Sequence, residues 1–128
     1  MNKIAKKSLI ILIPLILLYV HVPAQTVSEF EICGDVVDRE AKDIRNVFRE
    51  DESAWAWMRL TDGTVGDSIT VEWYAGEELL HSHKLAVKYE SMRTYATKKL
   101  TQSGSWKVVI KNEEGESLEE GTFQVGEG

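Results

Sequence analysis

The sequence predicts an all-β fold, an immunoglobulin-like antiparallel β-sandwich of about seven strands. From residue 25 onward, apolar residues alternate with polar ones at a period of two, which is the spacing of half-buried strands. Turn residues separate these runs at intervals of about 8–12 residues, as in sandwiches. About 100 residues are enough for one small hydrophobic core and too few for two.

The expected strands follow one another along the chain. Apolar residues occupy both faces of the second one, which predicts a central strand covered on both sides. Gly-containing turns at Thr61–Thr64, Ala75–Glu78 and Asn112–Gly115 separate the strands. The strands are expected over residues 30–36, 54–60, 69–74, 79–89, 93–97, 106–111 and 118–125.

Residues 38–51 are the exception to this pattern. Ala41, Ile44, Val47 and Phe48 recur at helical spacing. This predicts either one short helix or an irregular strand-edge excursion at the end of the sandwich.

The N-terminus has the layout of a secretory signal peptide. Three lysines within residues 1–8 precede an apolar run over residues 9–22, which is shorter than the roughly 20 residues of a membrane-spanning helix. Small residues at 22–24 predict cleavage after Ala24, so residues 1–24 are the signal peptide and 25–128 a single exported domain. The alternative is an uncleaved N-terminal anchor. Either way, we expect a periplasmic or extracellular domain that contacts a membrane only through such an uncleaved segment.

Charge excludes one class of partner. Residues 1–24 hold three of the 15 basic residues and none of the 21 acidic ones, so residues 25–128 carry a net charge of −9. Such a charge repels nucleic acid.

Cys33 is the single cysteine and cannot form an internal disulfide. It is expected to be a buried free thiol that packs as a small apolar group, with pairing between chains as the alternative.

Motifs over nearly the whole of residues 25–128 resemble one protein family. They are Cys33–Glu40, Val71–Glu77, Met92–Leu100, Gly104–Ile110 with Gly115, and Leu118–Val125. This succession is similar to the bacterial domain-of-unknown-function family 2914. The resemblance implies an exported or membrane-attached β-domain without an established activity. Where the family often has a histidine, two positions before Trp73, this chain has Val71, so no polar role is carried over.

His81 and His83 are the sharpest candidates for chemistry. Residues two apart on a strand project from one face, so their imidazoles could share a metal ion. Two ligands fall short of the three or four of a zinc site, so the expectation is a solvated strand face and no cofactor. No G-x-S-x-G nucleophile motif is present, and the chain is not expected to be an enzyme.

Binding is the expected function. Trp55 and Trp57 are candidates for an aromatic platform, whereas Trp73 and Trp106 are expected in the core. Arg93, Lys98 and Lys99 form a basic cluster in an acidic domain. We therefore expect a non-catalytic interaction domain of the bacterial cell envelope that binds an envelope protein or a glycan. The alternatives are a metal-binding or enzymatic domain centred on His81 and His83, and a structural domain that forms a homodimer.

Overall fold

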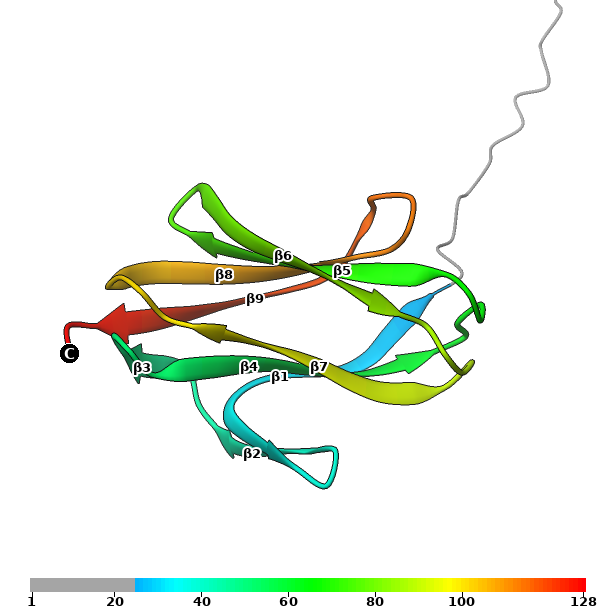
Figure 1. Ribbon diagram of the computed structural model, residues 1–128, viewed down its shortest axis with the longest axis horizontal. Helices are drawn as coiled ribbons and strands as arrows, with labels where there is room; N and C mark the ends of the chain where they lie inside the picture. Colours follow the sequence, from blue (N-terminus) through cyan, green and yellow to red (C-terminus); the bar gives the residue numbers. More distant parts are fainter. Residues whose placement is uncertain (1–24) are drawn as a thin grey trace, which may run out of the picture.

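The computed structural model describes residues 25–128, which form two β-sheets packed face to face (Figure 1). One sheet has four strands in the order β2-β1-β4-β7, and the other has five in the order β3-β9-β8-β5-β6. All neighbouring strands are antiparallel except β3 and β9. The strands are β1 (Thr26–Val37), β2 (Glu40–Ile44), β3 (Val47–Arg49), β4 (Ser53–Thr61), β5 (Ser68–Ala75), β6 (Glu78–Ala86), β7 (Met92–Lys99), β8 (Gly104–Lys111) and β9 (Ser117–Gly126). The predicted all-β, immunoglobulin-like sandwich is confirmed.

Side-chain alternation builds the core. In β5, Ile69, Val71 and Trp73 are buried while their neighbours on either side are partly exposed. Phe123 of β9 contacts three other aromatic rings, those of Phe48, Trp73 and Trp106, at centroid distances of 5.4, 6.4 and 5.9 Å. Trp73 and Trp106 are fully buried, as predicted. All four rings belong to the five-stranded sheet, and they pack in one core with Ala54, Ala56, Met58 and Leu60 of the four-stranded sheet.

β4 is a central strand, between β1 and β7. Its inner face, from Ala54 to Leu60, is buried in the core. On its outer face, the Nε1–H of Trp57 donates a hydrogen bond to the carbonyl oxygen of Arg39 over 2.8 Å. Arg39 lies in the turn of the β1–β2 hairpin, so this hairpin folds back over the outer face of the sheet.

Of the two alternatives predicted for residues 38–51, the short helix is wrong, and the strand-edge excursion agrees with the edge strands β2 and β3. This segment contains the turn after β1, then β2 and β3, and no helix occurs anywhere in residues 25–128. The apolar residues at helical spacing do not share a buried face, because Phe48 is buried whereas Ile44 and Val47 are 58% and 60% exposed. A helix would also be broken by Asp43, which has a φ of 57°.

Four strands lie at sheet edges: β2 and β7 in one sheet, β3 and β6 in the other. β6 and β7 follow each other in the chain and belong to different sheets, joined by residues 87–91. With no helix among residues 25–128, there is none there that is long and apolar enough to span a membrane. The predicted signal peptide and its cleavage after Ala24 lie outside the described residues.

Candidate functional site

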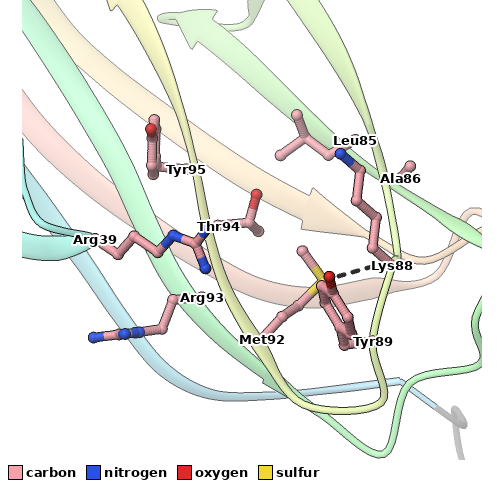
Figure 2. A pocket seen from close by; sticks show the side chains of 9 residues that line it. All are labelled: Arg39, Leu85, Ala86, Lys88, Tyr89, Met92, Arg93, Thr94 and Tyr95. Atoms are coloured by element: carbon pink, nitrogen blue, oxygen red, sulfur yellow. Dashed lines mark hydrogen bonds between the residues drawn. The ribbon is translucent and has the colours of Figure 1, made fainter.

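A pocket opens at the edge of β7, where the β1–β2 turn meets two consecutive segments of the chain that are distant from it in the sequence (Figure 2). These two segments are the end of β6 with the loop after it, and the first half of β7. Figure 2 shows Arg39, Arg93 and Tyr95 on one side and the residues of β6 and its loop on the other. The lining residues of this edge pocket are Arg39, Leu85, Ala86, Lys88, Tyr89, Met92, Arg93, Thr94 and Tyr95.

The β1–β2 hairpin brings Arg39 to this pocket. Val37 pairs with Glu40, so Asp38 and Arg39 form a two-residue turn, and both have positive φ, 52° and 64°. Positive φ at both central residues is typical of a type I′ turn, whose twist matches that of the flanking strands. The hydrogen bond from Trp57 to the Arg39 carbonyl then fixes the turn against the sheet.

Arg93 and Arg39 differ in their ion pairs. Arg93 lies directly opposite Arg59 on β4, and each of these like charges has its own carboxylate: Glu40 for Arg93 and Glu29 for Arg59. Within residues 25–128, no carboxylate pairs with the guanidinium of Arg39. The edge pocket therefore presents two cations, Arg39 and Lys88, whose charges are not balanced by an ion pair with the described part of the chain.

Two tyrosines flank these cations. Tyr95, on the outer face of β7, is 42% exposed and meets the indole of Trp55 edge to face, with centroids 5.4 Å apart. Tyr89, in the loop after β6, is 63% exposed. Leu85 and Met92 add apolar surface, and the backbone N–H of Lys88 donates to Sδ of Met92 over 3.4 Å. The edge pocket combines cations, phenol rings and apolar atoms, which is a composition suited to binding.

The side chains of the edge pocket are chemically suited to binding negative charge. Arginine guanidinium groups bind carboxylates and phosphates through paired hydrogen bonds. None of the lining residues is a histidine or a carboxylate.

The structure divides the five predicted binding residues. Arg93 lines the edge pocket, and Trp55 supports it through Tyr95. Trp57 is only 3% exposed and serves to position the hairpin, so its ring is not an open platform. Lys98 and Lys99 lie beyond the pocket, at the far end of β7. They project to opposite faces of the sheet, so the three cations do not form one cluster.

Sequence reasoning missed Arg39, Tyr89 and Tyr95. Arg39 was hidden because residues 38–51 were interpreted at helical spacing. A turn signal was present, since Val36-Val37 and Ala41 flank a short polar stretch that contains Asp38. Tyr89 and Tyr95 could have been identified as candidates because they lie close to Arg93 in the sequence.

His81 and His83 form a second cluster, on the edge strand β6. Their rings lie edge to face with centroids 4.3 Å apart. Nδ1 of His83 accepts a hydrogen bond from Nε1–H of Trp73 over 3.2 Å. An indole can only donate, so Nδ1 keeps its lone pair for Trp73 and the proton of the neutral ring lies on Nε2. Both nitrogens of His83 are then engaged or protonated, which disfavours metal coordination.

Burial lowers the pKa of His83, and the nearby positive charges of His81 and Lys98 lower it further. In residues 25–128, no group of three or more His, Cys, Asp or Glu side chains is placed to hold a metal ion. His83 thus packs between β6 and the core, whereas His81 is exposed.

Cys33 is a buried free thiol, as predicted. Its Sγ lies 3.9 Å from the carbonyl oxygen of Trp55, to which it donates a weak hydrogen bond. Burial raises the pKa of the thiol, which keeps it in its unreactive protonated form.

Comparison with protein-family models confirms the predicted resemblance. The model described as "Protein of unknown function (DUF2914)" matches residues 66–125, from the turn before β5 to the end of β9. The match includes the loop after β6 and β7, and thus every lining residue of the edge pocket except Arg39. No curated protein matches the chain.

Solved structures with related shape include the CARDB domain of the PF1109 protein from Pyrococcus furiosus. Its crystal structure in complex with di-metal ions has a TM-score of 0.44 and 18% identity, and the match covers 80% of this chain and 91% of that one. A solution NMR structure of the same domain has a TM-score of 0.40 and 19% identity, and the match covers 81% of this chain and 94% of that one. A β-glucosidase from Listeria innocua in complex with gluconolactone has a TM-score of 0.44 and 14% identity, and the match covers 77% of this chain and 16% of that one.

Proposed function

We propose that this chain is a non-catalytic, exported binding domain of the cell envelope, and that it binds an acidic group of a partner protein at the edge pocket. The observation that carries the proposal is the position of Arg39. Its guanidinium has no carboxylate partner within residues 25–128 and lines the same pocket as Arg93 and the two exposed tyrosines Tyr89 and Tyr95. A cation held at a fixed turn next to aromatic rings is an arrangement typical of binding hot spots.

Charge supports an acidic partner group. Residues 25–128 carry a net charge of −9, so an acidic partner is repelled at long range everywhere except where cations gather. The edge pocket holds three cations, Arg39, Lys88 and Arg93, and its lining includes no carboxylate. Electrostatic complementarity of this kind selects the orientation in which two proteins meet.

The histidine-centred alternative has less support. A metal ion shared by His81 and His83 would require a free imidazole nitrogen on His83, and the bond from Trp73 uses the lone pair of Nδ1. The homodimer alternative would use the open edges of the sheets. Pairing of two copies through β7 is opposed by the like charges along this strand.

The test is site-specific cross-linking of the full chain in the cell that produces it. A photoreactive benzoyl-phenylalanine replaces Tyr89 at the edge pocket. In the control variant it replaces Glu120, an exposed residue of β9 in the other sheet. We expect a protein adduct from position 89 and none from position 120. An adduct of equal yield at both positions, or a glycan adduct that resists protease, would contradict the proposal.

A matched pair of substitutions tests the role of Arg39. Arg39→Asn removes the charge but suits the positive φ of the turn, and Arg39→Lys retains the charge. We expect Arg39→Asn to lower the affinity for the partner about tenfold, and the yield of the adduct with it. This corresponds to the loss of one charge-assisted hydrogen bond of about 1.5 kcal/mol. Arg39→Lys should lower the yield of the adduct less than Arg39→Asn does. An unchanged yield for Arg39→Asn would exclude this residue from binding.

A further inference from the structure

We propose that β7 binds its partner by strand addition: an extended segment in which acidic and apolar residues alternate pairs with the open edge of β7. This inference rests on the proposed function and specifies how the partner binds. It starts from the position of β7 at the end of its sheet, with β4 on one side and no strand of residues 25–128 hydrogen-bonded on the other.

The hydrogen bonds around Leu100 show which main-chain groups of β7 are free. Leu100 donates to Glu52 and accepts from Asp51, so its N–H and C=O point toward the β4 side. In an antiparallel pair this direction alternates along the strand. The N–H and C=O groups of Arg93, Tyr95, Thr97 and Lys99 therefore point away from β4, toward the open edge.

One end of this edge is already occupied. The ammonium group of Lys98 donates to the carbonyl oxygen of Lys99 over 3.1 Å. The open stretch thus runs from Arg93 to Thr97, and the edge pocket lies along its first half. Main-chain groups of three residues remain available to an added strand, which is the mode of binding by strand addition.

The side chains of β7 define what the added strand must carry. On the outer face, Arg93 precedes Tyr95 and Thr97, and Arg39, which has no ion pair within residues 25–128, lines the same pocket. The outward residues of the partner strand are therefore expected to be acidic. On the inner face, the added strand lies beside Thr94 and the buried Ala96, with Leu85 also lining the pocket. The inward residues of the partner are therefore expected to be apolar.

A second copy of this chain does not fit as the added strand. Antiparallel pairing of two β7 strands about Ala96 would place Arg93 of one copy opposite Lys99 of the other. Directly opposed like charges destabilise a strand pair. β7 holds three cations and no carboxylate, so its edge repels a copy of itself and attracts an acidic strand.

The experiment uses an acetylated and amidated eight-residue peptide that alternates glutamate with valine. Hydrogen exchange of the backbone amides of the full chain is followed by NMR with and without this peptide. At saturating peptide, we expect the amides of Tyr95 and Thr97 to exchange at least about tenfold more slowly, because strand pairing protects amides. The amides of β3, the edge strand at the far end of the other sheet, serve as the internal reference and should not change.

Two control peptides separate the contributions of charge and main chain. A peptide that alternates lysine with valine should give no protection. A glutamate–valine peptide with N-methyl groups on all its amides cannot donate hydrogen bonds along either edge, and it should also fail. Protection by the lysine peptide, or equal protection by the N-methylated one, would overturn strand addition.

The outcome for strand addition is distinguishable from the outcome for the proposed function. If the cross-link from position 89 is found but no peptide protects Tyr95 and Thr97, the edge pocket binds a partner without strand pairing and this inference is wrong. If the cross-link itself is absent, the proposed function fails. Slower exchange of both amides with the glutamate peptide alone supports the inference.

Discussion

The indole N–H of Trp73 donates a hydrogen bond to Nδ1 of His83 across 3.2 Å, and this bond joins the edge strand β6 to the centre of the core. Trp73 is fully buried and packs against Phe123. Protonation of His83 would place a second N–H against the indole N–H, so the hydrogen bond requires a neutral imidazole. A residue that the sequence offered as a metal ligand is thus a packing element whose protonation state affects the fold.

Stability is expected to fall in mild acid because of His83. Burial, His81 and Lys98 lower its pKa in the folded chain, so between that pKa and the usual histidine value of about 6.5 the unfolded chain binds more protons. The free energy of unfolding should therefore decrease as the pH falls below about 6.5 and level off below the folded-state pKa. Urea denaturation over a pH series measures this slope.

The matched variants for this prediction are His83→Gln and His81→Gln. Glutamine at 83 keeps an acceptor for Trp73 and does not titrate, so the slope in this pH window should largely disappear. His81→Gln removes a neighbouring charge only and should retain most of the slope. Parallel pH profiles for the parent chain and His83→Gln would show that His83 does not cause the acid sensitivity.

Zinc is expected to leave the melting temperature unchanged. His83 offers no free lone pair while Trp73 occupies Nδ1, and His81 alone is a weak ligand. Thermal unfolding at neutral pH with zinc near stoichiometry tests this in the parent chain and in the double variant His81→Gln/His83→Gln. A zinc-dependent rise seen only in the parent would favour the metal-binding alternative.

Trp106→Ala is expected to destabilise the fold severely. The Trp106 ring is buried and stacks on Phe123, and its Nε1–H donates to the carbonyl oxygen of Gln102 over 2.9 Å. Truncation of a buried aromatic residue to alanine costs about 3–5 kcal/mol, a large part of the stability of a small domain. Trp55→Ala, at a half-buried ring on the outer face, should cost clearly less. Equal losses measured by chemical denaturation would mean that Trp106 is not a central core residue.

The sequence was sufficient for the strands that follow a strict alternation. β5 buries every second residue, and in β8 the alternating Trp106, Val108 and Ile110 are all buried, although Val109 between them is buried too. A period of two therefore identified both strands and their inner faces. It was insufficient for β2 and β3, because β3 has three residues and the hairpin turn depends on positive φ at Asp38 and Arg39. Short strands next to unusual turns leave too few residues for a period to be recognised.

The candidate site was predictable only in part. Arg93 was identified from local charge alone. Arg39 reaches the same pocket through a hairpin whose position depends on the contact with Trp57, and no local pattern encodes a contact between residues so far apart. The same contact buries the Trp57 ring that had been expected to be a candidate platform.

Cys33 is expected to be unreactive in the folded chain. The thiol is buried, and burial raises its pKa, so little thiolate is available at neutral pH. Titration with a disulfide reagent should be slow in native buffer and fast in denaturant. A native rate close to the denatured one would indicate that β1 and β4 separate readily around Cys33.

Arg45→Met is expected to destabilise the end of the sandwich where β2, β3 and β4 meet. The Arg45 guanidinium makes two hydrogen bonds to the carboxylate of Glu52, at 3.1 and 3.3 Å, and lies 4.2 Å from the centre of the buried Phe48 ring. The hydrogen bond from Arg45, and after it the one from the backbone N–H of Arg49, lowers the pKa of Glu52. The contribution of this carboxylate to the free energy of unfolding is therefore present above about pH 4.5 and is lost as the pH falls through the lowered pKa.

Arg45→Met should therefore lower the melting temperature at neutral pH and reduce the difference between neutral and acidic conditions. Lys42→Met is the charge-matched control, since Lys42 lies exposed on β2 and should change neither quantity by much. Arg45→Lys should recover only part of the loss, because an ammonium group cannot form the paired hydrogen bonds to Glu52. If Arg45→Met and Lys42→Met melt alike at both pH values, the Arg45 cluster makes no net contribution to stability.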